Sequence, residues 1–339
     1  MPRTYDRRII VFLSVAVLST AASIFAQSGR EHAYRAPRTP GGQPDISGVW
    51  TNTTITRLER PTQFANKEFF TEEEATAAER EAADRRARLD APSDVRTEPL
   101  PIGGRIGSYN AFWYSAQDSI VSTRRTSLVV DPPNGRVPTQ PEAETRARWL
   151  VTHRTDTYEN MSPYSRCITR GIPGSMLPNV YNTGNHILQT PAAVVIRHEM
   201  MGYRVIPLSN GRNVPDQIDQ WMGDARGYWD GDTLVVETTG FTDKGWITPN
   251  GNAGRMHGVP VTEDLRVVER FTRTSETQLD WQVTIHDPEV YTAPWTIDLP
   301  LTSEPDYILY EYACHEGNHA VLGVLGGARA VEQDGHAHE

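Results

Sequence analysis

The stretch QWMGDARGYWDGDTLVVETTGF, from Gln220 to Phe241, decides the predicted fold. Asp230 and Gly231 separate an aromatic arm from a β-branched arm, and an Asp-Gly pair between such arms is the strongest short-range signal for a tight β-hairpin. Downstream, TEDLRVVERFT, QLDWQVTIHD and DYILYEYAC repeat short runs of strand-forming residues separated by turn residues. This repetition is typical of an antiparallel meander.

Further strands are expected on both sides of this hairpin. The segments are DISGVWTN, TSLVV, HILQTP, AVVIRHE, YRVIPL and TAPWTIDLP. Roughly ten strands without βαβ alternation predict a mainly β fold. The expected architecture is an antiparallel up-and-down, lipocalin-like barrel, and the alternative is a β-sandwich. The triplet Gly48-Val49-Trp50 is similar to the Gly-x-Trp opening of lipocalin-like barrels.

Two helices are expected to interrupt the strands, near 71–90 and 141–153, and a third in GNHAVLGVLGGARAVEQ, lying against the barrel. Thr71 followed by Glu74 forms a capping-box pattern at the start of the first helix. Pro141 suits the first position of the second helix, in which Trp149 and Leu150 are the expected buried contacts.

The amino terminus has the pattern of an export signal. Arg3, Arg7 and Arg8 precede an apolar run that is too short to span a membrane and is followed by small residues up to Ala26. We therefore expect a periplasmic or secreted protein with no membrane span in the mature chain. The expected organisation is a signal peptide at 1–26, a flexible leader at 27–44, a single β-barrel domain at 45–330 and a disordered tail at 331–339.

Composition excludes several function classes. The formal net charge is −10 and the basic residues are scattered, so the sequence predicts no nucleic-acid partner. The patterns G-x-S-x-G, P-loop, G-x-G-x-x-G after a strand and C-x-x-C are absent, which disfavours serine hydrolases, nucleotide enzymes and dithiol oxidoreductases. No cofactor is required by any motif, and the oligomeric state is not indicated.

The two cysteines, Cys167 and Cys314, are far apart in the sequence. In an oxidising compartment such a pair most simply forms a disulfide. A catalytic thiol is the alternative, but a free reactive thiol is poorly preserved outside the cytosol.

Four segments, RRTSLVVDPPNGRVP, RCITRGIPG, GDARGYWDGDTLVVETTGF and YEYACHEGN, resemble those of a large, functionally uncharacterised group of exported proteins of soil and marine bacteria. The resemblance covers most of the mature chain and implies export without implying an activity. In that group the position of His319 is usually aromatic, so a role for this histidine would be peculiar to this chain.

Ionisable residues around the hairpin are candidates for acid–base chemistry. Strand alternation places Arg197 and Glu199 on one face and His198 on the other. If these groups point into the barrel, they are held at low dielectric, where pKa values shift far enough for proton transfer. If they lie on the outer surface of the barrel, they form cross-strand ion pairs that contribute little to stability. The candidate catalytic residues are Glu199, Arg204, Asp224, Arg226, His315 and Glu316.

The segment HEGNH, from His315 to His319, matches the zinc-protease pattern H-E-x-x-H. Such motifs lie inside a long helix, whereas here a strand is expected to end at Cys314 and Gly317 disfavours a helix. We therefore expect no metal site, with His315 and His319 as the remote alternative. His315 and Glu316 are instead expected to act as an acid–base pair, or to cap a helix.

Aromatic residues are the candidates for ligand binding. Tyr109, Asn110 and Trp113 belong to a glycine-rich loop, and Trp221, Trp229 and Trp281 belong to or flank strands. These residues suit a small hydrophobic or aromatic molecule. For the loop alone, packing over one end of the barrel is an equal alternative, but the aromatics together are more than such a plug needs, so some of them are expected to line a ligand cavity. The frequency of arginine and carboxylate within the strands favours a cofactor-free lyase, isomerase or hydrolase, with a non-catalytic periplasmic carrier as the alternative.

Overall fold

The computed structural model describes residues 34–92, 97–98, 114–115, 118–209, 214–215, 218–248 and 251–333, without the side chains of 251–253. The chain divides into two compact units, Met1–Tyr34 and Arg35–Glu339, and all the described helices and strands belong to the second unit. The predicted signal peptide and residues 334–339 lie outside the described residues.

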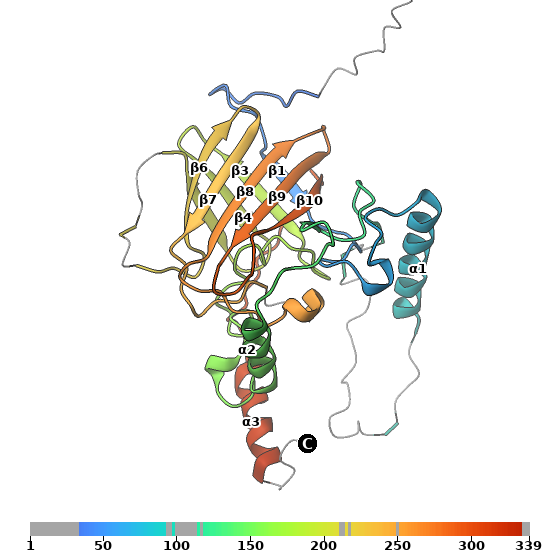
Figure 1. The fold of residues 1–339 in the computed structure, drawn as a ribbon, viewed down its shortest axis with the longest axis vertical. Coiled ribbons are helices and arrows are strands. Elements are labelled where there is room, and N and C mark those ends of the chain that lie inside the picture. The colour runs from blue at the N-terminus through green and yellow to red at the C-terminus, as the bar shows by residue number, and fades with distance from the viewer. Residues whose placement is uncertain are drawn as a thin grey trace, which may run out of the picture. The chain divides into compact units, whose positions relative to one another are not determined.

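Ten strands form one antiparallel sheet that curls into a nearly closed barrel (Figure 1). The strand order is β5-β4-β3-β1-β10-β9-β8-β7-β6, and β2 pairs with β10. Most neighbours in this order are also consecutive in the sequence, as in an up-and-down barrel, and the fold prediction is confirmed. The strands are β1 (Gly48–Thr51), β2 (Val129–Asp131), β3 (Gly184–Gln189), β4 (Ala193–His198), β5 (Tyr203–Pro207), β6 (Asp224–Asp230), β7 (Thr233–Thr239), β8 (Arg266–Arg273), β9 (Gln278–His286) and β10 (Trp295–Ser303).

The hairpin predicted at Asp230 and Gly231 joins β6 to β7. Asp230 pairs with Thr233, so Gly231 and Asp232 form a two-residue turn. Gly231 has φ +62° at the first central position, which a type II′ turn reserves for glycine. Arg38, from the segment preceding the barrel, forms an ion pair of 2.5 Å with Asp232.

Side chains fill the inside of the barrel. The residues of β9 alternate as expected, with Leu279, Trp281, Val283 and Ile285 fully buried. The largest side chains that are less than 2% exposed come from several strands and include Trp50, Ile187, Ile196, Ile206, Leu234, Phe271, Trp281 and Trp295. Small barrels are commonly packed in this way, so the interior is a hydrophobic core rather than an open cup.

One expected strand does not form. Residues 306–314, DYILYEYAC, leave the sheet after β10 and run as irregular chain with Ile308 and Tyr310 exposed. The reason lies in the closure of the barrel, because β1 and β2 already pair with β10. The segment is instead tied to the outside of the barrel, where Arg197 Nη2 donates to the carbonyl oxygen of Tyr310.

The first helix has the predicted start. In α1 (Glu72–Asp90), Thr71 and Glu74 form the expected capping box, and Ala75 and Ala82 are the buried residues of this helix.

The turns of 3-10 helix are η1 (Thr62–Phe64), η3 (Tyr158–Asn160) and η4 (Gly251–Met256). Among the described residues no helix is long and apolar enough to cross a membrane.

The buried contacts of the second helix, α2 (Pro141–Thr152), differ from the prediction. Trp149 is 49% exposed and Leu150 is half-buried, whereas Ala143 and Ala147 are buried. A Cβ atom on Gly258 would lie 3.2 Å from the carbonyl oxygen of Ala147. The backbones therefore approach closely, and only small side chains fit on that helix face.

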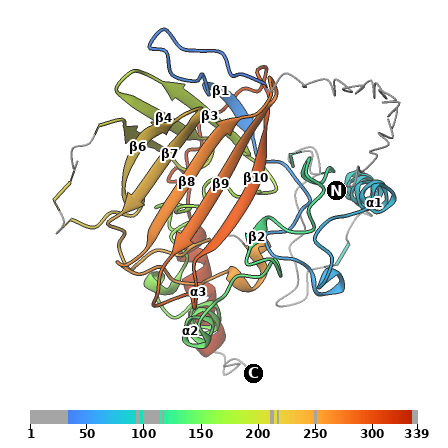
Figure 2. The same cartoon turned by 45° about the horizontal axis from the view of Figure 1, so that its top comes forward.

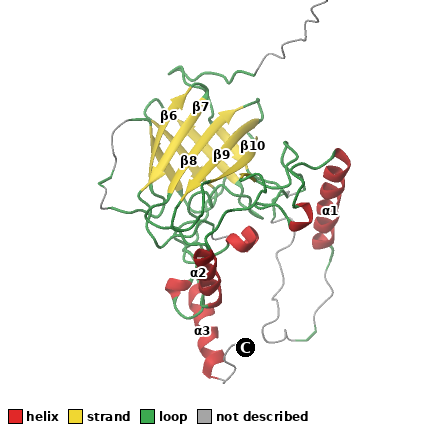
Figure 3. Cartoon of the chain, viewed as in Figure 1, coloured by secondary structure: helices red, strands yellow, loops and turns green. Residues whose placement is uncertain are grey.

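The third helix, α3 (Ala320–Gln333), lies beside α2 at the end of the barrel where most loops gather (Figures 2 and 3). Arg329 donates to the carbonyl oxygens of Thr155 and Asp156, which follow α2. The helix is therefore held by the loop after α2 rather than by the barrel wall as predicted. Ala328 is its buried residue.

Candidate functional site

A pocket of about 400 Å³ lies beside the disulfide that joins Cys167 to Cys314. The S–S distance is 2.04 Å, so the predicted pairing is confirmed. The disulfide connects the loop before β3 to the chain that follows β10. The pocket is lined by Cys167, Ile168, Met201, Gly202, Glu311, Tyr312, Ala313, Cys314, His315 and Glu316.

Tight turns bring these lining residues together. Met201 and Gly202, with φ +67° and +98°, form the turn between β4 and β5, which is closed by a hydrogen bond of 3.0 Å from His198 N to Gly202 O. Cys167 also has a positive φ, +58°. These left-handed positions are uncommon for residues other than glycine, and the disulfide fixes one of them.

The lining combines apolar and polar groups. Ile168, Met201, Tyr312 and the disulfide supply apolar surface, while Glu311, His315 and Glu316 supply exposed polar groups. A concave, partly apolar site of a few hundred Å³ with a small number of polar groups is typical of small-molecule binding. Methionine suits such a surface because its flexible thioether adapts to different shapes.

A cluster of tyrosines connects the pocket to a buried arginine. The hydroxyl of Tyr164 lies 3.3 Å from that of Tyr181 and 3.4 Å from that of Tyr312. The Arg170 guanidinium lies 5.5 Å from the centre of the Tyr164 ring. Burial lowers the pKa of Arg170 and raises the pKa of the Tyr164 hydroxyl.

Of the six predicted catalytic residues, His315 and Glu316 line this pocket. Arg204 lies in the barrel core and forms a two-point ion pair with Glu269, whose Oε1 also accepts from Trp281 Nε1 at 3.0 Å. Arg204 is 6% exposed and Glu269 is 0% exposed. This pair belongs to the packed core and is out of reach of a solvent-borne molecule.

Glu199, Asp224 and Arg226 lie elsewhere. Glu199 is buried and accepts from Tyr307 Oη at 2.6 Å and from Gly184 N at 3.1 Å. Burial, followed by the hydrogen bond to Glu199, raises the pKa of Tyr307. The predicted sharing of one face by Arg197 and Glu199 is wrong, because β4 ends at His198 and Glu199 turns inward.

The Asp224 and Arg226 side chains bond to each other at the start of β6. The ion pair measures 2.7 Å, and the side chains are 15% and 25% exposed. Neither residue lines the disulfide pocket. The structure therefore does not assemble the predicted acid–base cluster at one place.

The predicted ligand-binding aromatics separate in the same way. Trp281 is a core residue, and Trp229 packs against the core. Trp221 lines a cavity of about 10 Å³ together with Arg170 and Trp246, which is room for about one water molecule. Tyr109, Asn110 and Trp113 lie outside the described residues.

The HEGNH segment is not part of a helix. A turn follows Cys314, Gly317 has φ +65°, and α3 begins only at Ala320. His315 and His319 thus lack the one-turn helical spacing of a zinc protease. Across the described part of the chain, no group of three or more His, Cys, Asp or Glu residues could hold a metal ion.

His198 gives the barrel a pH dependence. It is 3% exposed, its Nδ1 hydrogen-bonds to Asn185 Oδ1 over 2.9 Å, and burial followed by the nearby charges of Arg204 and Arg170 lowers its pKa from 6.5 to about 3. Between these two values the unfolded chain binds a proton that the folded chain does not, so stability falls as pH falls through this window.

We expect the His198 contribution to the free energy of unfolding to drop by about 2 to 3 kcal/mol between pH 7 and pH 4.5. Urea unfolding gives the free energy of unfolding of the wild type and of His198→Gln at both pH values. The change between the two pH values in the wild type, minus the same change in the variant, measures this drop, because the other titrating groups are common to both proteins. Parallel pH profiles for the two proteins would contradict the assignment.

Sequence reasoning missed Ile168, Met201 and Tyr312, which supply the apolar part of the pocket. The available signals were the cysteine pair and the Met-Met-Gly turn between two short strands.

Comparison with protein-family models, with curated proteins and with solved structures finds no match for this chain. The class defined by the structure is therefore an antiparallel β-barrel protein with a pocket beside its disulfide.

Proposed function

We propose that this protein binds a small hydrophobic or aromatic molecule in the disulfide pocket and acts as a non-catalytic carrier. The pocket supports this function best, because apolar lining from Ile168, Met201 and Tyr312 is combined with a few exposed polar groups. The filled barrel core supports a site on the outside of the barrel rather than within it.

Export is part of the proposal. It is supported by the signal-like amino-terminal sequence, by the resemblance to exported soil and marine bacterial proteins, and by the intramolecular disulfide, which persists in oxidising compartments. A periplasmic or secreted carrier would meet its ligand there without needing a cofactor.

A thermal-shift screen against phenolics, terpenoids and other hydrophobic compounds tests the proposal. A ligand that binds only the folded state raises the melting temperature by mass action. Ala313→Trp should abolish the shift, because the exposed Ala313 lines the pocket and a large side chain there fills it. Ala77→Trp, at an exposed position of α1, is the matched control. A shift produced only by a divalent metal and reversed by a chelator would favour a metal site involving His315 instead.

A second candidate, an acid–base lyase, isomerase or hydrolase, is favoured by one observation. Tyr307 and Glu199 share a hydrogen bond of 2.6 Å, and Glu199 precedes the turn that carries Met201. Mass spectrometry of each hit after incubation with the protein separates the two candidates. A carrier returns the compound unchanged, whereas an enzyme converts it and loses that conversion in Tyr307→Phe.

A further inference from the structure

Four arginines converge on a second pocket, of about 350 Å³, on another part of the molecule. It is lined by residues 57–63 together with Arg136, Gly254 and Arg255. Among the described lining residues, the arginines are Arg57, Arg60, Arg136 and Arg255, and the one carboxylate is Glu59. In a chain with a net charge of −10, such a concentration of positive charge is unexpected.

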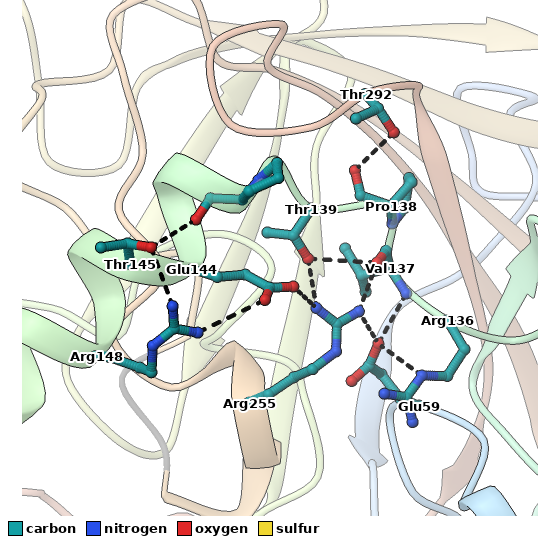
Figure 4. Close-up of polar contacts among 11 residues, drawn as sticks. Glu59, Arg136, Val137, Pro138, Thr139, Glu144, Thr145, Arg148, Arg255 and Thr292 are labelled. Carbon is teal, nitrogen blue, oxygen red and sulfur yellow. Dashed lines mark hydrogen bonds and ion pairs between the residues drawn. The ribbon is translucent and has the colours of Figure 1, made fainter.

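Arg255 is at the centre of the polar network beside this pocket (Figure 4). Its Nη1 donates to Glu144 Oε1 at 2.6 Å, and its Nη2 donates to Glu59 Oε1 at 2.7 Å. Thr139 Oγ1 and the carbonyl oxygen of Val137 accept from the same guanidinium. These bonds fix its plane, while its buried Nε has no hydrogen-bond partner among the described residues.

Neutral acceptors hold Arg60. Its side chain donates to Thr126 Oγ1 and to the carbonyl oxygen of Pro133, both at 3.0 Å, and the residue is 4% exposed. The charge of Arg60 is therefore held in place without a carboxylate within ion-pair distance in the part of the chain that the structure describes.

Arg136 and Arg57 supply the least constrained charges. Arg136 donates to the carbonyl oxygen of Arg60, and its Nε lies 3.8 Å from the same Glu59 oxygen that Arg255 contacts. Arg57 is exposed and its side chain forms no hydrogen bond or ion pair with a described residue. Glu59 and Glu144 together balance two of the four guanidinium charges and leave an excess of two.

We propose that this pocket binds a small molecule carrying an oxyanion, that is, a carboxylate, phosphate or sulfate group. Guanidinium groups are suited to this ligand because their planar donors match the oxygens of such groups in pairs. Arg60 is pre-positioned by its bonds to Thr126 and Pro133, so little side-chain order is lost on binding, and Arg57 and Arg136 can close on the ligand. The Nη donors of Arg255 are already used by Glu59, Glu144, Thr139 and Val137, so Arg255 forms part of the pocket wall and does not donate to the ligand. The site is separate from the disulfide pocket and does not depend on the function proposed there.

Isothermal titration calorimetry with inorganic phosphate, sulfate and citrate tests the proposal at constant ionic strength set with chloride. At least one probe should bind saturably with one site per chain. Arg57→Gln and Arg136→Gln should each weaken that binding by about tenfold or more, as expected for loss of a hydrogen bond to a charged group.

Arg266→Gln is the matched control, because it removes the same charge from an exposed surface pair with Glu237. It should leave the affinity within about twofold of wild type. The proposal is overturned if none of the three anions binds saturably at millimolar concentration, or if all three variants lose affinity equally. If Arg136→Gln does not fold, Arg57→Gln decides alone, since no described side chain depends on Arg57.

Discussion

Replacing Glu269 with alanine should lower the free energy of unfolding by about 3 to 5 kcal/mol, because it leaves the charge of Arg204 unpaired inside the barrel. Both carboxylate oxygens of Glu269 accept from the Arg204 guanidinium, and one of them also accepts from Trp281. Removal of the carboxylate therefore leaves two buried donor groups without their acceptor. The loss is measured by urea unfolding at neutral pH.

Two further variants separate the buried charge from simple loss of contacts. In the double variant Arg204→Met with Glu269→Leu, both charges are absent, and stability should return to within about 1 to 2 kcal/mol of wild type or exceed it. Arg266→Gln breaks an exposed pair between β8 and β7, and should change stability by less than about 1 kcal/mol. Equal losses in Glu269→Ala and in the double variant would contradict this explanation.

Loss of the disulfide should have an effect of similar size. Cys167 and Cys314 are 147 residues apart, and the chain-entropy model assigns about 5 kcal/mol to the cross-linking of a loop of that length, with about 2 to 5 kcal/mol typical when native disulfides are removed. The double variant Cys167→Ser with Cys314→Ser should unfold at a correspondingly lower urea concentration.

Reduction of the wild-type protein is the control for the serine substitutions. Treatment with a strong reductant should lower its stability to that of the double variant, and should leave the double variant unchanged. A wild-type protein whose unfolding does not respond to full reduction, verified by mass spectrometry, would contradict a stabilising role for this disulfide.

The barrel was predictable because its signals are local. The hairpin signalled by Asp230 and Gly231 and the alternation of Leu279, Trp281, Val283 and Ile285 are each encoded within a few residues. The structure forms both, with the turn itself at Gly231 and Asp232. The segment 306–314 has the same strand-like composition, yet it forms no strand because β1 and β2 already pair with β10. Closure of a sheet is a long-range property that composition does not reveal.

The candidate site was predictable only in part. The disulfide between Cys167 and Cys314 was predicted from the sequence, and it places His315 and Glu316 beside the loop that contains Cys167. Arg204 could not be assigned, because its partner Glu269 is 65 residues away and neither residue reveals from sequence whether it faces the core or a cavity. The arginine pocket was missed for the same reason, since its arginines are scattered along the chain.

Titration of the best hydrophobic hit into wild type, Ala313→Trp and Ala77→Trp tests the central claim most directly. We expect calorimetry to give one site per chain, an affinity for Ala77→Trp equal to that of wild type, and at least a tenfold loss in Ala313→Trp, equivalent to about 1.4 kcal/mol. Equal affinity in all three proteins would place the ligand elsewhere and would contradict the assignment of the disulfide pocket as the binding site.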